Sequence, residues 1–164
     1  MGMSSAVRYI AGITERYARL GFTPYRWYEA DSAPRLTKLN VPLQEARIGA
    51  LTTSGAYVVG QVGFHYKDDT TVRAIPKSTP ISDMRFAHIT QRYLDNAKQD
   101  PNCVSPLQAL TQLASAGEIG SVADEMFSCM GGIYSQRRVR EELIPDLHQR
   151  FADQGVDAVL LAPM

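Results

Sequence analysis

Few residues of this chain are suited to covalent chemistry, and the two cysteines are considered first because a thiolate is a strong nucleophile. Cys103 and Cys129 have no CxxC pair and no metal-ligand spacing around them, so no metal site is predicted. Cys129 stands in an apolar stretch without a neighbouring base or cation to lower its pKa, which predicts a buried and slowly alkylated structural residue. An alternative is a small-molecule enzyme that uses Cys129, and this alternative requires that thiol to be exposed and acidic.

His88 is the histidine of most interest, because it stands in a short apolar run at 86–89 rather than in a charged surface stretch. An imidazole there could donate or accept a proton near neutral pH. It could equally be a core histidine whose hydrogen bonds are satisfied, and the sequence leaves both interpretations open.

The first strong strand signal covers residues 46–53 and ends in hydroxyl side chains and a glycine. They are Thr52, Thr53, Ser54 and Gly55. A turn of this kind after a buried strand can bind a small anion through backbone N–H groups, and a plain tight turn is the alternative. The glycines have neither the GxGxxG nor the P-loop spacing, so the sequence gives little support to nucleotide binding.

The end of the chain predicts the two elements that position this turn. Residues 139–154 form an amphipathic helix, and Gly155 fits the left-handed position after it; its apolar residues are Val139, Leu143, Ile144, Leu147 and Phe151. The apolar run at 156–161 is typical of a parallel strand buried on both faces. Ligands of such sheets bind outside the carboxyl ends of the strands. We therefore expect the strands at 46–53 and 156–161 to be parallel neighbours, with the turn and Met164 at one edge.

Length and composition predict one α/β domain with a three-layer, Rossmann-like fold and a short, mainly parallel sheet in its 164 residues. We expect an N-terminal segment at 1–41 before a core at 42–164. This segment contains a predicted helix at 5–20 and an aromatic arm at 22–28, and the arm would pack on the core or on a partner subunit. Lys+Arg and Asp+Glu number 17 each, so no nucleic-acid partner is expected. No apolar run reaches the roughly 20 residues of a membrane span, and no signal peptide is visible, which favours a cytoplasmic protein with reduced thiols.

Short segments from residue 42 onward carry a family resemblance through their order. They are PLQEARI at 42–48, LTTSG at 51–55, RAIP at 73–76, DPN at 100–102 with PL at 106–107, GEIG at 117–120, FSCMG at 127–131 and GVDAVLL at 155–161. In this order they resemble the selenoprotein B family of glycine, sarcosine, betaine and D-proline reductases.

The resemblance implies an oxidoreductase subunit that reductively cleaves a bond to the carbon next to a carbonyl or carboxylate of an amino-acid-like or betaine-like substrate. In that family a selenocysteine, or a cysteine in its place, follows the last strand and attacks as a selenolate or thiolate. A partner reductase subunit, which bears a pyruvoyl group in the D-proline enzyme, and a homo-oligomer are also expected. By the same resemblance His88 would support catalysis, and the substrate site would be lined by Thr52, Thr53, Ser54, Gly55, Asp100 and Asn102.

The chain departs from the family in one respect: neither of its cysteines occupies the position of the nucleophile, which the resemblance places just after Met164. We therefore expect no cofactor in this chain and a selenocysteine in the full-length product, with a UGA codon after Met164 read as stop. The alternative from another class is a non-catalytic α/β binding or assembly module that lacks the redox residue.

Overall fold

The computed structural model describes residues 8–24, 28–35, 37–90 and 94–164. The chain forms two compact units, residues 1–36 and 37–164. The first unit contains α1 (Tyr9–Arg19), which ends before Gly21 in the left-handed conformation (φ 78°), as the sequence predicts. Residues 5–7 of the predicted helix and residues 25–27 of the aromatic arm lie outside the described residues.

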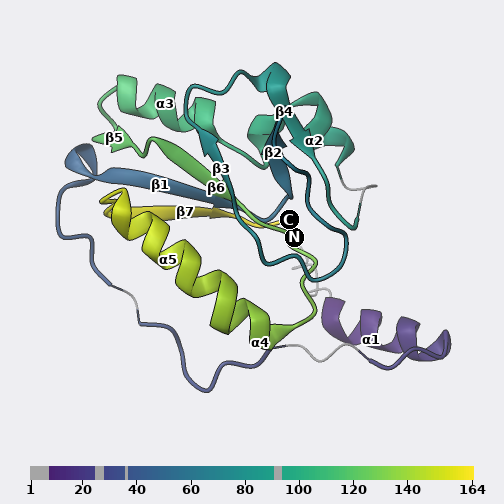
Figure 1. Cartoon of the computed structure of the whole chain (residues 1–164). Helices are drawn as coiled ribbons and strands as arrows, with labels where there is room; N and C mark the ends of the chain where they lie inside the picture. The colour runs from purple at the N-terminus through teal and green to yellow at the C-terminus, as the bar shows by residue number, and fades with distance from the viewer. Residues whose placement is uncertain (1–7, 25–27, 36, 91–93) are drawn as a thin grey trace, which may run out of the picture. The chain divides into compact units, whose positions relative to one another are not determined.

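The second unit contains the main sheet, with β1 (Arg47–Thr52) at its centre. β1 pairs in parallel with β5 (Ser121–Val122), with β6 (Glu125–Ser128) and with β7 (Ala158–Ala162). β3 (Arg73–Pro76) pairs antiparallel with β6. The sheet is short and mainly parallel, as predicted (Figure 1).

Helices cover both faces of this sheet, which gives the predicted three layers (Figure 1). On one face α3 (Leu107–Ser115) packs on a core that includes Ile48 and Ala50 of β1. On the other face a helix runs continuously through α4 (Gln136–Arg138), a π-helical turn η5 (Val139–Leu143) and α5 (Ile144–Asp153). Gly49 faces this helix, because a Cβ on it would lie 2.9 Å from the Phe151 ring. Alternate residues of β1 thus face opposite layers, as the pleat of a strand requires.

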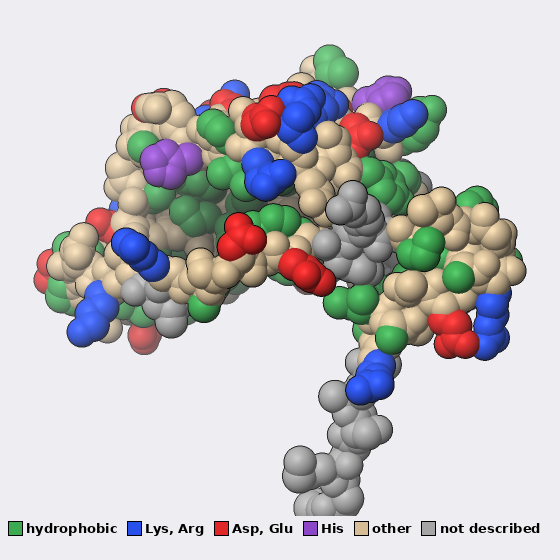
Figure 2. Space-filling model, turned by 90° about the horizontal axis from the view of Figure 1, so that it is seen from below, with side chains coloured by type: hydrophobic (Ala, Val, Ile, Leu, Met, Phe, Trp, Pro, Cys, Tyr) green, Lys and Arg blue, Asp and Glu red, His purple; other side chains and the backbone are tan. Residues whose placement is uncertain are grey.

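Smaller elements complete the second unit. A two-stranded antiparallel sheet pairs β2 (Ala56–Val58) with β4 (Met84–Phe86). The short helices are η1 (Leu43–Glu45), η2 (Ile81–Asp83), α2 (Asp95–Gln99) and η4 (Pro101–Cys103). In the described part of the chain, none of the helices is long and apolar enough to cross a membrane. Acidic and basic side chains are interspersed on the face shown in Figure 2, in line with the balanced composition.

Two details of the predicted helix–strand pair are wrong. Leu160 and Leu161 of β7 are 43 % and 63 % exposed, so this strand is not buried on both faces. The reason is that β7 pairs with β1 alone among the described strands, and the flanking helices do not cover an edge strand fully. Ile144 is 52 % exposed, because the residues of this helix that point inward recur every four positions at 143, 147 and 151. Gly155 has φ 60°, which confirms its left-handed position.

Candidate functional site at the carboxyl edge of β1 and β7

The carboxyl ends of β1 and β7 meet at one edge of the sheet. Their pairing runs from Ile48–Ala158 to Thr52–Ala162. It continues beyond the strands, where Thr53 N donates to Ala162 O at 3.2 Å and Met164 N donates to Thr53 Oγ1 at 2.9 Å. The prediction that the strands are parallel neighbours, with the turn and Met164 at one edge, is confirmed.

The turn after β1 uses two of its hydroxyls internally. Thr52 and Ser54 are fully buried. Thr52 Oγ1 donates to Ser54 Oγ at 2.9 Å and accepts from Ser54 N at 3.2 Å. Thr53 is half-buried, and its hydroxyl faces the end of β7. Of the three predicted hydroxyl residues, Thr53 is the one whose side chain joins the two strand ends.

Gly55 brings two distant segments beside the end of β1. It has φ 66°, and a Cβ on it would lie 2.2 Å from Ala87 O. Its N–H donates to Cys129 O at 3.1 Å, and its carbonyl accepts from Ala87 N at 3.0 Å. A residue with a side chain would meet both a strained backbone and a steric overlap here. The approach of residues 87 and 129 to β1 therefore depends on glycine at position 55.

This approach places His88 at the same edge. The imidazole is 7 % exposed, and its Nδ1 accepts from Thr90 N at 3.1 Å. Its Nε2 is buried without a hydrogen-bond partner among the residues that the structure describes. A Cβ built on Gly131 would lie 3.0 Å from His88 Nε2, 3.0 Å from Met164 O and 2.9 Å from Thr53 O. Residues of four separate segments thus converge beside Gly131. Burial lowers the pKa of His88.

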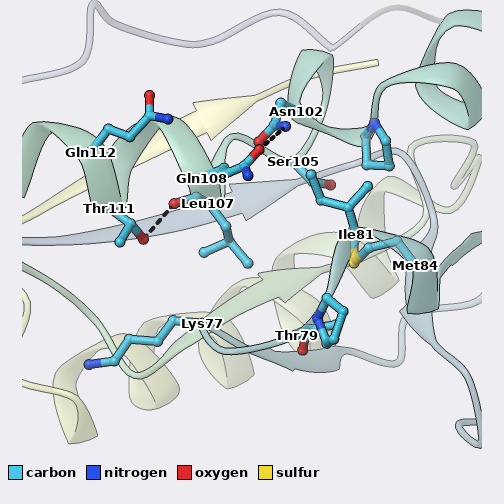
Figure 3. Close-up of a pocket in the computed structure, with 12 residues that line it drawn as sticks. Lys77, Thr79, Ile81, Met84, Asn102, Ser105, Leu107, Gln108, Thr111 and Gln112 are labelled. Atoms are coloured by element: carbon cyan, nitrogen blue, oxygen red, sulfur yellow. Dashed lines mark hydrogen bonds between the residues drawn. The ribbon is translucent and has the colours of Figure 1, made fainter.

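The structure does not bring Asp100 and Asn102 to this edge. Asp100 Oδ1 accepts from Asn102 N and from Asn102 Nδ2, both at 3.0 Å, and so caps η4. Asn102 lines a separate pocket of about 260 Å³ together with Lys77 and residues of α3 (Figure 3). The same pocket is lined by Met84 of β4 and by Leu107 and Gln108 of the first turn of α3. Of the six residues predicted to line one substrate site, the four of the turn lie at the end of β1, whereas Asp100 and Asn102 have their contacts in η4 and with Gln108 of α3.

Cys129 does not meet the condition for a nucleophile. It is 2 % exposed, and burial raises its pKa to about 11. Cys103 is exposed in η4, beside Asn102 of the separate pocket.

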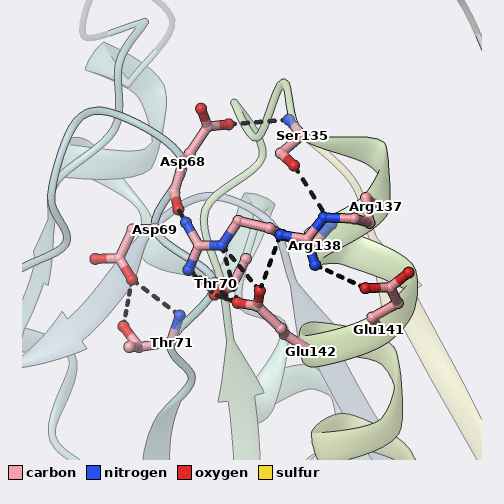
Figure 4. Close-up of polar contacts among 9 residues, drawn as sticks. All are labelled: Asp68, Asp69, Thr70, Thr71, Ser135, Arg137, Arg138, Glu141 and Glu142. Carbon is pink, nitrogen blue, oxygen red and sulfur yellow. Dashed lines mark hydrogen bonds and ion pairs between the residues drawn. The ribbon is translucent and has the colours of Figure 1, made fainter.

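A polar network that was not predicted from the sequence attaches the loop after Tyr66 to the helix beginning at α4 (Figure 4). The Arg138 guanidinium donates to Asp68 O, to Thr70 Oγ1 and to the carboxylate of Glu142. Asp68 Oδ1 accepts from the N–H groups of Tyr134 and Ser135. The spacing of Arg138 and Glu142 at i and i+4 was the available signal, but the partners in the loop are about 70 positions away.

Comparison with known proteins identifies the family. The model described as "Glycine/sarcosine/betaine reductase selenoprotein B" matches residues 72–163, which is more than half of the chain. This chain belongs to the selenoprotein B family. The family match includes β3, β6, β7 and His88, and leaves the turn at 52–55 outside its range.

A curated relative supports the same assignment. The chain is 29 % identical over 130 residues to the D-proline reductase subunit gamma of Acetoanaerobium sticklandii, which covers 78 % of this chain and 52 % of that protein. The chain thus spans about half the length of this relative. No solved structure matches the chain.

Proposed function

We propose that this selenoprotein B family chain is part of a reductase subunit whose reaction takes place at the carboxyl edge of β1 and β7. The reaction is the reductive cleavage of a bond to the carbon next to the carboxylate of a small amino-acid-like or betaine-like substrate. The subunit works with a separate reductase subunit, in the cytoplasm.

One observation supports this location above the others. The pairing of β1 with β7 brings Thr53 and Met164 together, and the contacts of Gly55 bring His88 and Gly131 to the same point. Ligands of parallel α/β sheets bind outside the carboxyl ends of strands. The convergence of a buried imidazole and a turn at this edge fits that rule.

A selenocysteine or cysteine after β7 in the full-length product is the proposed redox residue. The described residues fit a reacting group there, because the buried Nε2 of His88 has no partner among them and packs, like Met164 O, against Gly131. Such a residue supplies a nucleophilic selenolate or thiolate. The reaction needs two electrons and two protons overall, which a dithiol such as dithiothreitol provides as it becomes a disulfide.

The residues of this chain hold the site in place. Thr53 accepts from Met164 N and thereby fixes where the backbone leaves β7. Gly55 holds residues 87–88 against the end of β1. The two cysteines of the chain take no part in the proposed chemistry, since Cys129 is buried with a raised pKa and Cys103 lies in η4.

The test uses the full-length gene product with the subunits that co-purify with it. The assay follows the loss of glycine, sarcosine, betaine or D-proline with dithiothreitol as the electron donor. We expect turnover of at least one substrate, lost when the selenocysteine or cysteine after β7 is changed to Ser. An intact, folded complex that consumes none of the four would contradict the proposal and favour the binding or assembly module.

A further inference from the structure

The hydrogen bonds of His88 determine which ring nitrogen carries its proton. Nδ1 accepts from the backbone N–H of Thr90 at 3.1 Å, and Thr90 Oγ1 lies 2.7 Å from the same nitrogen. A backbone N–H can only donate, so Nδ1 must present its lone pair. In the neutral ring the proton therefore lies on Nε2.

The neutral ring is the form that the surroundings of His88 favour. The side chain is 7 % exposed, and burial lowers its pKa from the ordinary value of 6.5. Near pH 7 the Nε2–H group is thus an uncharged, buried donor without an acceptor among the described residues. Buried donors without partners are rare in folded proteins and call for an explanation.

Nε2 lies directly beneath Gly131, which is itself exposed. A methyl group at position 131 would lie 3.0 Å from Nε2, so the donor packs closely against Gly131 and is buried by it. Thr53 O is 2.9 Å from the same point and is a hydrogen-bond acceptor of partial negative charge. A buried donor and an acceptor therefore both pack against Gly131, at the edge of the sheet.

We propose that the Nε2–H of His88 donates a hydrogen bond to the carboxylate of the substrate, while Thr53 O faces its cationic nitrogen. This inference rests on the proposed function. The names of the family and of the relative mention glycine, sarcosine, betaine and D-proline. All four share a carboxylate next to the carbon that bears nitrogen. The cationic nitrogen of each has no lone pair, so the carboxylate is the one strong acceptor that all four present. A hydrogen bond to an ionised acceptor is stronger than one between neutral groups.

The test is a titration of the full-length gene product, labelled with ¹⁵N at histidine, with glycine betaine. Choline is the matched ligand control, because it keeps the trimethylammonium group and lacks the carboxylate. We expect the ring shifts of His88 to report the Nε2–H tautomer, and its Nε2 resonance to move saturably with betaine and not with choline. His88→Phe should weaken the binding of betaine roughly tenfold or more, as expected for loss of a hydrogen bond to a charged group. His88→Gln, which keeps an N–H donor, should lose less, and His65→Gln should lose nothing.

An Nδ1–H tautomer, equal shifts with choline, or no saturable shift at His88 would overturn the inference. The outcome is separable from the proposed function, because the titration does not depend on turnover. An active complex in which His88→Phe leaves KM unchanged would overturn this inference alone. A chain that binds betaine through His88, in a complex without turnover, would overturn the proposed function alone.

Discussion

Replacement of Gly55 by alanine tests how the edge of the sheet is built. The left-handed conformation of Gly55 (φ 66°) costs a residue with a Cβ about 1–2 kcal/mol. The new methyl group would also lie 2.2 Å from Ala87 O, which cannot yield without breaking the 3.0 Å hydrogen bond from Ala87 N to Gly55 O. Overpacking costs about 1–3 kcal/mol, and a buried backbone group without a partner costs a similar amount. We expect Gly55→Ala to lose about 3–5 kcal/mol of unfolding free energy.

Gly117→Ala is the matched control, because Gly117 has φ 74° and no heavy atom within 4 Å of an added Cβ. It should lose about 1–2 kcal/mol, the dihedral cost alone. Urea unfolding followed by circular dichroism measures both variants. The amide signals of His88 and Thr90 should move in Gly55→Ala and stay in place in the control. A loss in Gly55→Ala no larger than that in Gly117→Ala would refute the proposed role of this contact.

Three further outcomes follow from burial. In the native chain iodoacetamide should modify Cys103 and leave Cys129 largely unmodified in a peptide map, since burial raises the Cys129 pKa to about 11 and leaves it roughly 100-fold less thiolate than an ordinary cysteine has. Equal rates would contradict the burial of Cys129. As the pH falls below 6.5 the unfolded chain binds a proton at His88 before the folded chain does, so stability declines down to the lowered folded pKa. Denaturant midpoints measured between pH 6.5 and the lowered pKa should therefore fall less steeply with pH in His88→Gln than in the native chain. The same pH dependence in both proteins would contradict the lowered pKa of His88. Leu147→Ala should cost about 2–4 kcal/mol by thermal unfolding and Ile144→Ala under about 0.5 kcal/mol, and similar losses would contradict the inward face assigned to this helix.

The parallel pairing of β1 and β7 was predictable because short apolar runs next to Gly155 and the turn at 52–55 are local signals. The exposure of Leu161 was not, since it depends on whether another strand or a helix covers β7. A sequence pattern reports how apolar a strand is but not how many neighbours it has.

The candidate site was predictable to a similar extent. The apolar run around His88 left its role open, and the role depends on contacts with Thr90 nearby and with Gly131, 43 positions away. The resemblance grouped Asp100 and Asn102 with the turn at 52–55, whereas the Asp-Pro-Asn signal itself predicts only the turn that the structure shows. Local spacing cannot tell which distant elements a loop packs against.

The location of the redox residue is the central claim, and alkylation of the full-length gene product tests it most directly. The reduced complex is treated briefly with iodoacetamide near neutral pH, with and without substrate, and the modified residue is mapped by mass spectrometry beside the remaining activity. We predict that a selenocysteine or cysteine after β7 is modified first and that substrate protects it. The activity should fall in proportion to the fraction of this residue that is modified. Activity lost through modification of Cys103 or Cys129, with the residue after β7 unmodified, would contradict it.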